Sequence, residues 1–312
     1  MTLQIWSRRI ALWACVLCAP AQADVVNRLV VPFPPGGSLD RMARMLAPEL
    51  AKRTGQVFVV ENRPGGDGSL AADYVRRSAG EEKNLLMVNS FIATGQVQGV
   101  FKFDVLTAFK PVIQLGDTET WLVARADFPG ADLKSMLVQW RSGGHQLSCA
   151  APPGQFLQAC ELLARAFPGQ FVVAPFKGEL VALQALMGGH VDLMFVTRTA
   201  AFEGVQGGRV RLLSTVGSRR SQTPFEHMPR LGASLPGLEL HGYLGVFAPS
   251  GMEDSEITHL NKLINEVLRS ESFLQFMQAS HIQPAGGAPT DMLKTFVQNV
   301  ERQKMWQLPR SH

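Results

Sequence analysis

The stretch RLVVPFPPGGSLDRMARMLAPEL, residues 28–50, decides the fold of this chain. It opens on a β-branched run, Arg28 to Pro32, which is typical of a short buried strand. The loop FPPGG follows at 33–37, and Ser38 is a good N-cap for a helix whose apolar residues recur with helical spacing. A strand that passes through a glycine loop into a helix predicts the first unit of a parallel α/β sheet.

The same alternation continues along the chain. A strand at 57–60 leads through a second glycine loop to a helix capped by Ser69, and a third strand spans 85–88. Further strands are predicted at 121–124, 146–150, 171–174, 191–195, 210–215 and 244–248. Further helices are predicted at 132–140, 155–166, 179–187, 253–270, 271–279 and 289–304, with a long connection at 216–240. This pattern predicts a doubly wound α/β fold.

Composition restricts the class of protein. The chain has 312 residues, of which 46% are hydrophobic and 18% are charged, with a net charge of +4. These values exclude a disordered protein, and the length predicts about two domains on a prior of roughly 100–200 residues each. Because Lys and Arg are scattered and form no basic face, we expect no nucleic-acid partner.

The first 23 residues have the pattern of a secretory signal peptide. Arg8 and Arg9 precede an apolar run from Ile10 to Ala19, and a small-x-small cleavage site ends at Ala23. The run is too short to cross a bilayer core of roughly 30 Å as a helix. We therefore expect cleavage after Ala23 and a mature protein in the periplasm.

Catalytic and metal-binding patterns are missing from the sequence. It contains no Gly-x-Ser-x-Gly, no His-Glu-x-x-His and no phosphate loop, and its histidines lack metal-ligand spacing. The run from Gly66 to Ala71 imitates a dinucleotide fingerprint, but Glu-Asn-Arg-Pro separates it from the strand, where the fingerprint needs a tight turn. We expect no catalysis, no cofactor and no metal.

Two glycine-rich loops remain, and each leads into the N-terminus of a helix. Both follow strands of one parallel sheet, so they should open at its carboxyl edge, where such sheets bind ligands. Bare backbone N–H groups and helix N-termini together favour an anion such as a carboxylate. The simpler alternative is that these glycines only permit turns. The candidate ligand-binding residues of these loops are Phe33, Pro35, Gly36, Gly37, Ser38, Asp40, Gly66, Gly68 and Ser69.

Two cysteines, Cys149 and Cys160, remain after removal of the signal segment. An even pair in an oxidising compartment is compatible with a disulfide. The first ends a predicted strand and the second lies in the following helix, so the geometry is demanding. Two independently buried thiols are an equal alternative.

Several motifs resemble one family closely. The segments VPFPPGGSLD at 31–40 and VVENRPGGDG at 59–68 are similar to the two opening signatures of the tripartite tricarboxylate transporter solute receptors, also called Bug-type (Bordetella uptake) periplasmic binding proteins. The likeness continues through FKG at 176–178, LMGGHVDLMF at 186–195 and GVFAPSG at 245–251. It covers nearly the whole mature chain in order.

The resemblance implies a type II periplasmic-binding-protein fold, with two doubly wound α/β domains around a central cleft with a hinge. The first domain would be discontinuous, 24–122 plus 243–312, and the second would span 123–242. In such receptors a ligand carboxylate lies between the two glycine-rich loops. The resemblance adds further candidate ligand-binding residues, namely Ser90, Phe91, Thr94, Gly154, Gln155, Thr197 and Tyr243.

Some positions depart from the family pattern. The family's Gly-Ser-x-x-His segment reads Pro153-Gly154-Gln155-Phe156-Leu157, and Val196-Thr197 stands where many members have Asp or Asn. The carboxylate-holding half is retained and the selecting half has changed, which favours a more apolar ligand or a receptor that no longer feeds a transporter.

We therefore expect an exported, monomeric receptor that captures a small organic acid, either a di- or tricarboxylate or an aromatic acid, for a membrane permease of a tripartite transporter. The alternatives are a ligand-sensing partner of a membrane sensor kinase and an exported α/β enzyme.

Overall fold

The computed structural model describes residues 26–78, 83–129, 133, 136, 138, 146–217, 221 and 224–306. The expected signal peptide and its cleavage site lie outside the described residues, as does most of the expected helix at 132–140. In the described part of the chain, no helix is both long and apolar enough to cross a membrane.

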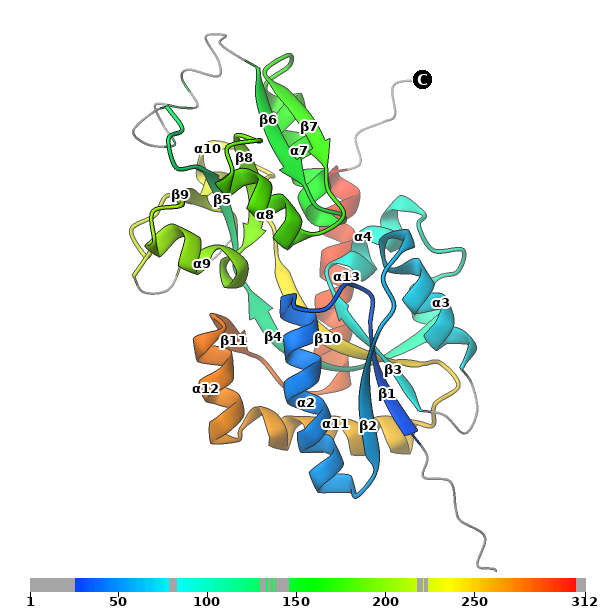
Figure 1. The fold of residues 1–312 in the computed structure, drawn as a ribbon. Helices are drawn as coiled ribbons and strands as arrows, with labels where there is room; N and C mark the ends of the chain where they lie inside the picture. Colours follow the sequence, from blue (N-terminus) through cyan, green and yellow to red (C-terminus); the bar gives the residue numbers. More distant parts are fainter. Residues whose placement is uncertain are drawn as a thin grey trace, which may run out of the picture.

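The chain forms two α/β halves, each built on its own sheet (Figure 1). The first sheet has six strands in the order β11-β4-β10-β3-β1-β2, with β1 parallel to β2 and β3, and with β10 antiparallel to β3 and β4. Its strands are β1 (Val26–Val31), β2 (Val57–Asn62), β3 (Asn84–Asn89), β4 (Phe109–Thr118), β10 (Gly242–Pro249) and β11 (Ile282–Pro284).

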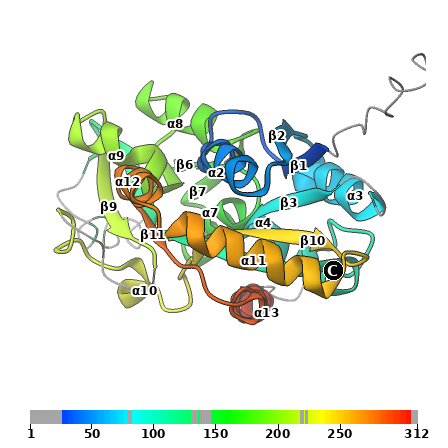
Figure 2. The same ribbon diagram turned by 90° about the horizontal axis from the view of Figure 1, so that it is seen from below.

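Helices cover this first sheet (Figure 2). They are α2 (Ser38–Thr54), α3 (Ser69–Arg77), α4 (Phe91–Gln98), α5 (Val105–Ala108), α11 (Asp254–Leu268), α12 (Glu271–Ala279) and α13 (Pro289–Trp306), with a short 3-10 turn η1 (Gly66–Gly68) before α3. The apolar stripe of α2 is buried against the sheet, which is why the helical spacing seen in the sequence predicts this element correctly.

The second sheet has five strands in the order β7-β6-β8-β5-β9. Its strands are β5 (Thr120–Arg125), β6 (Leu147–Ala151), β7 (Phe171–Pro175), β8 (Leu193–Thr197) and β9 (Val210–Thr215). Its helices are α7 (Gln155–Ala166), α8 (Glu179–Met187), α9 (Arg198–Gln206) and α10 (Leu231–Ser234). β6 is parallel to β7 and β8, whereas β5 runs antiparallel to β8 and β9.

The chain passes between the halves at two neighbouring points. β4 ends at Thr118 in the first sheet and β5 begins at Thr120 in the second, so a single residue separates them. The return passes into β10, which pairs with β4 at Gly242 and Thr118. The domain limits 24–122 plus 243–312 and 123–242 remain a prediction, which these crossings support.

One contact runs against a clean division at the C-terminal end. Trp306, the last residue of α13, packs in the core of the second half, and its indole Nε1–H donates to the carbonyl of Gly237 at 2.6 Å. Figure 1 shows α13 (red) extending up beside α7. Helix α13 therefore connects both halves.

Sequence periodicity missed β4, α4 and α9, as well as the short elements α5, α10 and β11. β4 carries Pro111 and Gly116, which interrupt the strand pattern. α4 has little amphipathic contrast, because its first five residues are all buried. α9 begins with Arg198, a cation that is buried and therefore breaks the polar-outside pattern.

Candidate ligand-binding site

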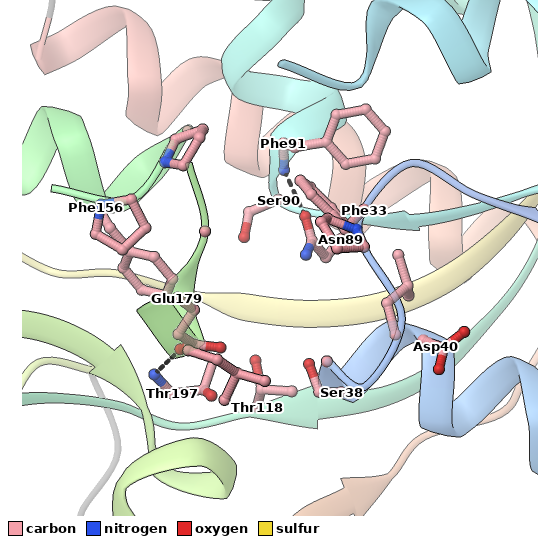
Figure 3. A pocket seen from close by; sticks show the side chains of 18 of the residues that line it. Phe33, Ser38, Asp40, Asn89, Ser90, Phe91, Thr118, Phe156, Glu179 and Thr197 are labelled. Atoms are coloured by element: carbon pink, nitrogen blue, oxygen red, sulfur yellow. Dashed lines mark hydrogen bonds between the residues drawn. The ribbon is translucent and has the colours of Figure 1, made fainter. Parts of the chain in front are cut away.

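A cavity of about 320 Å³ lies between the two halves (Figure 3). The loops after β1 and β3 and the end of β4 line it from the first half, and the loops after β6, β7 and β8 line it from the second. Its lining residues are Phe33, Pro34, Pro35, Gly37, Ser38, Leu39, Asp40, Asn89, Ser90, Phe91, Thr118, Pro152, Pro153, Gly154, Gln155, Phe156, Lys177, Gly178, Glu179, Leu180, Val181, Thr197 and Leu244. Loops at the carboxyl ends of strands are where open α/β sheets bind ligands.

The first glycine loop lies at this cavity, as the sequence predicts. Gly37 is the N-cap residue of α2, in an extended conformation with φ −71° and ψ 170°, and no side chain caps the helix end. The first-turn N–H groups of a helix have no intrahelical partner, and they attract negative charge. The cavity is therefore bordered by an uncapped helix N-terminus.

Asp40 holds this loop in shape. Its carboxylate accepts hydrogen bonds from the Gly36 N–H (2.9 Å), from Arg44 Nε (2.9 Å) and from Asn62 Nδ2 (2.9 Å). Although burial opposes ionisation, these three donors lower the pKa of Asp40. Its carboxyl group points away from Glu179 and Thr197 (Figure 3). Asp40, a predicted ligand contact, thus serves to position the loop.

The second glycine loop does not line the large cavity, which differs from the prediction for Gly66, Gly68 and Ser69. The sheet order explains this difference: β2 is the edge strand, so its loop opens one strand further from the second half than the loop after β1. Gly68, with φ +88°, lies against the ring of Phe91, which itself lines the cavity. The loop is in place to support the wall.

Three other predicted residues also lie off the cavity. Tyr243 is fully buried in the core of the first half, and this burial raises its pKa. Its neighbour Leu244 lines the cavity instead, because successive strand residues point to opposite faces. The Thr94 hydroxyl donates to the carbonyl of Ser90 at 3.1 Å. Thr94 lines a much smaller cavity beside Phe91. Gly36 has φ +98° and gives its N–H to Asp40.

The remaining predicted residues are brought together at the cavity. They are Phe33, Pro35, Gly37, Ser38, Asp40, Ser90, Phe91, Gly154, Gln155 and Thr197. Aromatic side chains make much of the wall: Phe33 and Phe91 meet edge to face at 5.5 Å between ring centroids, and Phe156 faces in from α7. Such a cavity suits a ligand with a hydrocarbon body.

Glu179 is a lining residue that sequence reasoning missed. It begins α8, and its Oε1 accepts the N–H of Thr197 from the neighbouring β8. Burial raises the pKa of this carboxyl group, and the bonds to Thr197 only partly oppose the shift. The Gly178-Glu179 turn into a helix after β7 is the signal that could have found it, since it is one more loop at a carboxyl edge.

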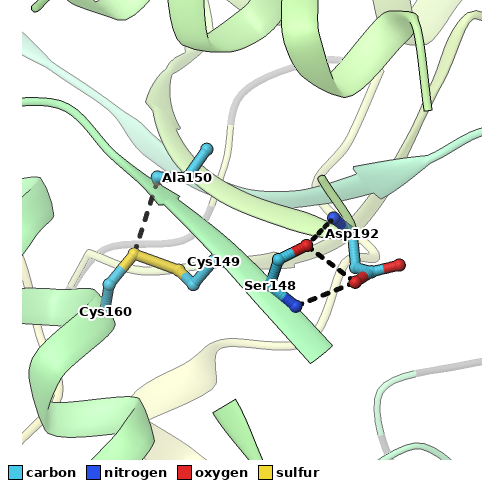
Figure 4. The surroundings of a disulfide bond; sticks show 5 residues. All are labelled: Ser148, Cys149, Ala150, Cys160 and Asp192. Carbon is cyan, nitrogen blue, oxygen red and sulfur yellow. Dashed lines mark hydrogen bonds between the residues drawn. A yellow bond between two sulfur atoms is a disulfide. The ribbon is translucent and has the colours of Figure 1, made fainter. Parts of the chain in front are cut away.

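A disulfide joins Cys149 of β6 to Cys160 of α7, with their Cα atoms 5.9 Å apart (Figure 4). Both cysteines are fully buried. Between them, the turn at Gly154 and the first residues of α7, Gln155 and Phe156, line the cavity. The bond therefore closes the base of a cavity-lining loop.

Ser148, the residue of β6 that precedes Cys149, is fixed to Asp192, which directly precedes β8. Its N–H and its hydroxyl both donate to Asp192 at 2.8 Å (Figure 4). Arg125 Nε donates to the other carboxylate oxygen at 3.0 Å. These bonds hold β6 in register beside the cavity-lining loops.

Taken together, these loops can hold an anionic group at the α2 N-terminus and enclose an apolar body. No group of three or more His, Cys, Asp or Glu residues suited to a metal ion occurs within the described ranges.

The comparisons with known proteins agree with this geometry. The model of the "Tripartite tricarboxylate transporter family receptor" matches residues 42–307. Protein BugT of Bordetella pertussis is 30% identical over 291 residues, which are 90% of this chain and 89% of BugT. The solved structure of Rpa4515 from R. palustris with adipate has a TM-score of 0.80 and 25% identity, covering 90% of this chain and 96% of that one.

A second solved structure, MatC from Rhodopseudomonas palustris with bound malate, has a TM-score of 0.79 and 26% identity, covering 90% of this chain and 98% of that one. These likenesses confirm the expected two-half α/β binding-protein fold. The chain belongs to the tripartite tricarboxylate transporter receptor family, that of the Bug-type periplasmic binding proteins.

Proposed function

We propose that the protein is a periplasmic receptor that captures a small organic acid in the cavity between its halves and delivers it to the membrane proteins of a tripartite transporter. The uncapped N-terminus of α2, which opens into this cavity at Gly37 and Ser38, carries the proposal. It offers backbone N–H groups and partial positive charge to a carboxylate, without an arginine.

The cavity volume and its lining support a ligand of modest size. Adipate and malate, the acids named for two similar structures, are small carboxylates. Here the walls add Phe33, Phe91 and Phe156, so the ligand body is mainly apolar. Family membership supports the transporter as partner and the periplasm as location. The sequence pattern of the first 23 residues supports export through a signal peptide cleaved after Ala23.

The proposal is tested by comparing acids with their amides. Thermal shift and calorimetry would be run with hexanoate and benzoate, and with hexanamide and benzamide as neutral counterparts of the same shape. We expect acids to bind and the amides to fail, because only a carboxylate gains from the helix N-terminus. A ligand at 100 times its dissociation constant should stabilise the fold by about 2.7 kcal/mol. Equal binding of acid and amide would contradict the proposal.

Delivery is a separate step with its own measurement. Uptake of a labelled acid that binds the receptor should depend on this protein in cells that carry the transporter's membrane subunits. Unchanged uptake after deletion of the receptor gene would contradict the transport role while leaving the binding role intact.

A further inference from the structure

Glu179 places a carboxyl group on the cavity wall that the second half contributes. It belongs to α8 in the second half, whereas the α2 N-terminus belongs to the first half, and both line the same cavity. Figure 3 shows the Glu179 side chain next to Thr197 and facing the interior of the cavity.

In the described part of the chain, no basic side chain neutralises Glu179. Within the residues that the structure describes, no Lys, Arg or His forms an ion pair with it, and its partners are the neutral N–H and hydroxyl of Thr197. Lys177 also lines the cavity, but it forms no ion pair with the carboxyl group and its side chain is largely exposed. The other acidic lining residue, Asp40, is already neutralised by Arg44 and occupied by two further donors.

This arrangement gives the two walls of the cavity different chemistry. The first half offers uncapped backbone N–H groups, which favour a negatively charged group. The second half offers the carboxyl group of Glu179, whose hydrogen bonds from Thr197 are uncharged, and a buried carboxylate is costly without a counter-charge. A second carboxylate placed there would put acceptor against acceptor, whereas a donor or a cation would complete the site.

We propose that Glu179 determines specificity, by selecting organic acids that carry an ammonium group at the end remote from the carboxylate and by disfavouring dicarboxylates. This inference rests on the proposed function, because it takes the α2 N-terminus as the carboxylate site. It extends that function by naming the second recognition group and the residue that reads it.

The test uses acids that differ only at the remote end. Calorimetry would measure hexanoate, 6-aminohexanoate and adipate, and the four-carbon set of butanoate, 4-aminobutanoate and succinate, against the full mature protein. The variant Glu179→Gln keeps the size and the acceptor oxygen for Thr197, and it removes the charge. Circular dichroism and thermal unfolding would first show that the variant is folded.

For the parent protein we expect the amino acid of one set to bind at least about tenfold more tightly than the diacid of the same length. In Glu179→Gln the amino acid should lose at least about tenfold in affinity, the diacid should gain, and the plain monoacid should stay within about twofold. Glu253→Gln is the matched control, because it makes the same change at an exposed carboxylate that does not line the cavity, and we expect it to leave the order of the three acids unchanged.

Three results would overturn the inference while leaving the proposed function standing. The first is a diacid that binds the parent as tightly as the amino acid does. The second is an order of affinities that Glu179→Gln leaves unchanged. The third is diacid binding that strengthens at low pH in the parent but not in Glu179→Gln, which would make Glu179 a protonated donor to a second carboxylate. Failure of all six probes, the plain monoacids included, would instead refute the carboxylate site itself.

Discussion

Gly37→Ala separates a role in ligand binding from a role in folding. Gly37 has φ −71°, a value open to every L-residue, and a Cβ built there would have no atom within 4 Å. The change therefore introduces no clash and no strained backbone. Ala is a poorer N-cap than Gly, which destabilises the folded state by up to about 1 kcal/mol. Because Ala restricts the unfolded chain more than Gly does, the change also stabilises the folded state by roughly 0.4–1 kcal/mol. We expect the free energy of unfolding to change by less than about 1 kcal/mol.

Binding should respond much more strongly. Gly37 lines the cavity at the α2 N-terminus, where the proposed carboxylate must approach the backbone. A methyl group there would push the carboxylate away from its N–H donors, and a hydrogen bond to a charged group contributes about 1.5–3 kcal/mol. At about 1.4 kcal/mol per tenfold, the dissociation constant should rise roughly 10- to 140-fold.

Gly55→Ala, at the other end of the same helix, is the matched control. Gly55 has φ +68° with no atom near its missing Cβ, and it does not line the cavity. It should lose about 1–2 kcal/mol of stability from the left-handed backbone and keep its affinity. Calorimetry with the tightest-binding acid of the six- and four-carbon sets, and urea unfolding, measure the two effects. A folded Gly37→Ala protein that binds within twofold of the parent would refute the α2 N-terminus as the carboxylate site.

Three further predictions concern stability and the cavity wall. Gly68→Ala would press a Cβ into the Phe91 ring, in a backbone with φ +88°. We expect the free energy of unfolding in urea to fall by at least about 1–2 kcal/mol. A fall of under about 0.5 kcal/mol would show that the ring moves freely. The Cys149–Cys160 bond closes a loop with sequence separation 11, so its reduction should lower the free energy of unfolding by about 3 kcal/mol. Thiol labelling of the denatured, unreduced protein should find neither cysteine reactive. His281 lies against Phe202, with their ring centroids 3.7 Å apart. Burial is the main cause that lowers the pKa of His281, and the charge of Arg198 lowers it further. The folded state therefore binds fewer protons than the unfolded state. The free energy of unfolding should therefore fall as the pH drops through the unfolded-state pKa of about 6.5. His281→Asn should flatten this dependence, because Asn tolerates the φ of +55°. An unchanged slope of stability against pH would contradict the assignment to His281.

Local sequence determined the units of this fold. The β-branched run, the glycine loop and the amphipathic stripe at residues 28–50 depend on neighbours along the chain, so they predict β1, the loop and α2 correctly. The same holds for α7, whose predicted limits of 155–166 match the structure. Where burial on all sides or an inward-facing charge removes periodic contrast, as in α4 and α9, local pattern carries no signal.

Tertiary structure decided which of these units meet. The two glycine loops look alike in sequence, yet β2 is the edge strand and β1 is not, so only the first loop lines the large cavity within the described structure. The alternation of β10 turned Tyr243 into the core and Leu244 to the cavity. Glu179 faces the α2 N-terminus only because the chain crosses between two sheets at Thr118 and Gly242, a pairing of residues far apart in sequence. Periodicity reports which face of an element is buried, whereas the partner that buries it is set by long-range strand order, which no local pattern records.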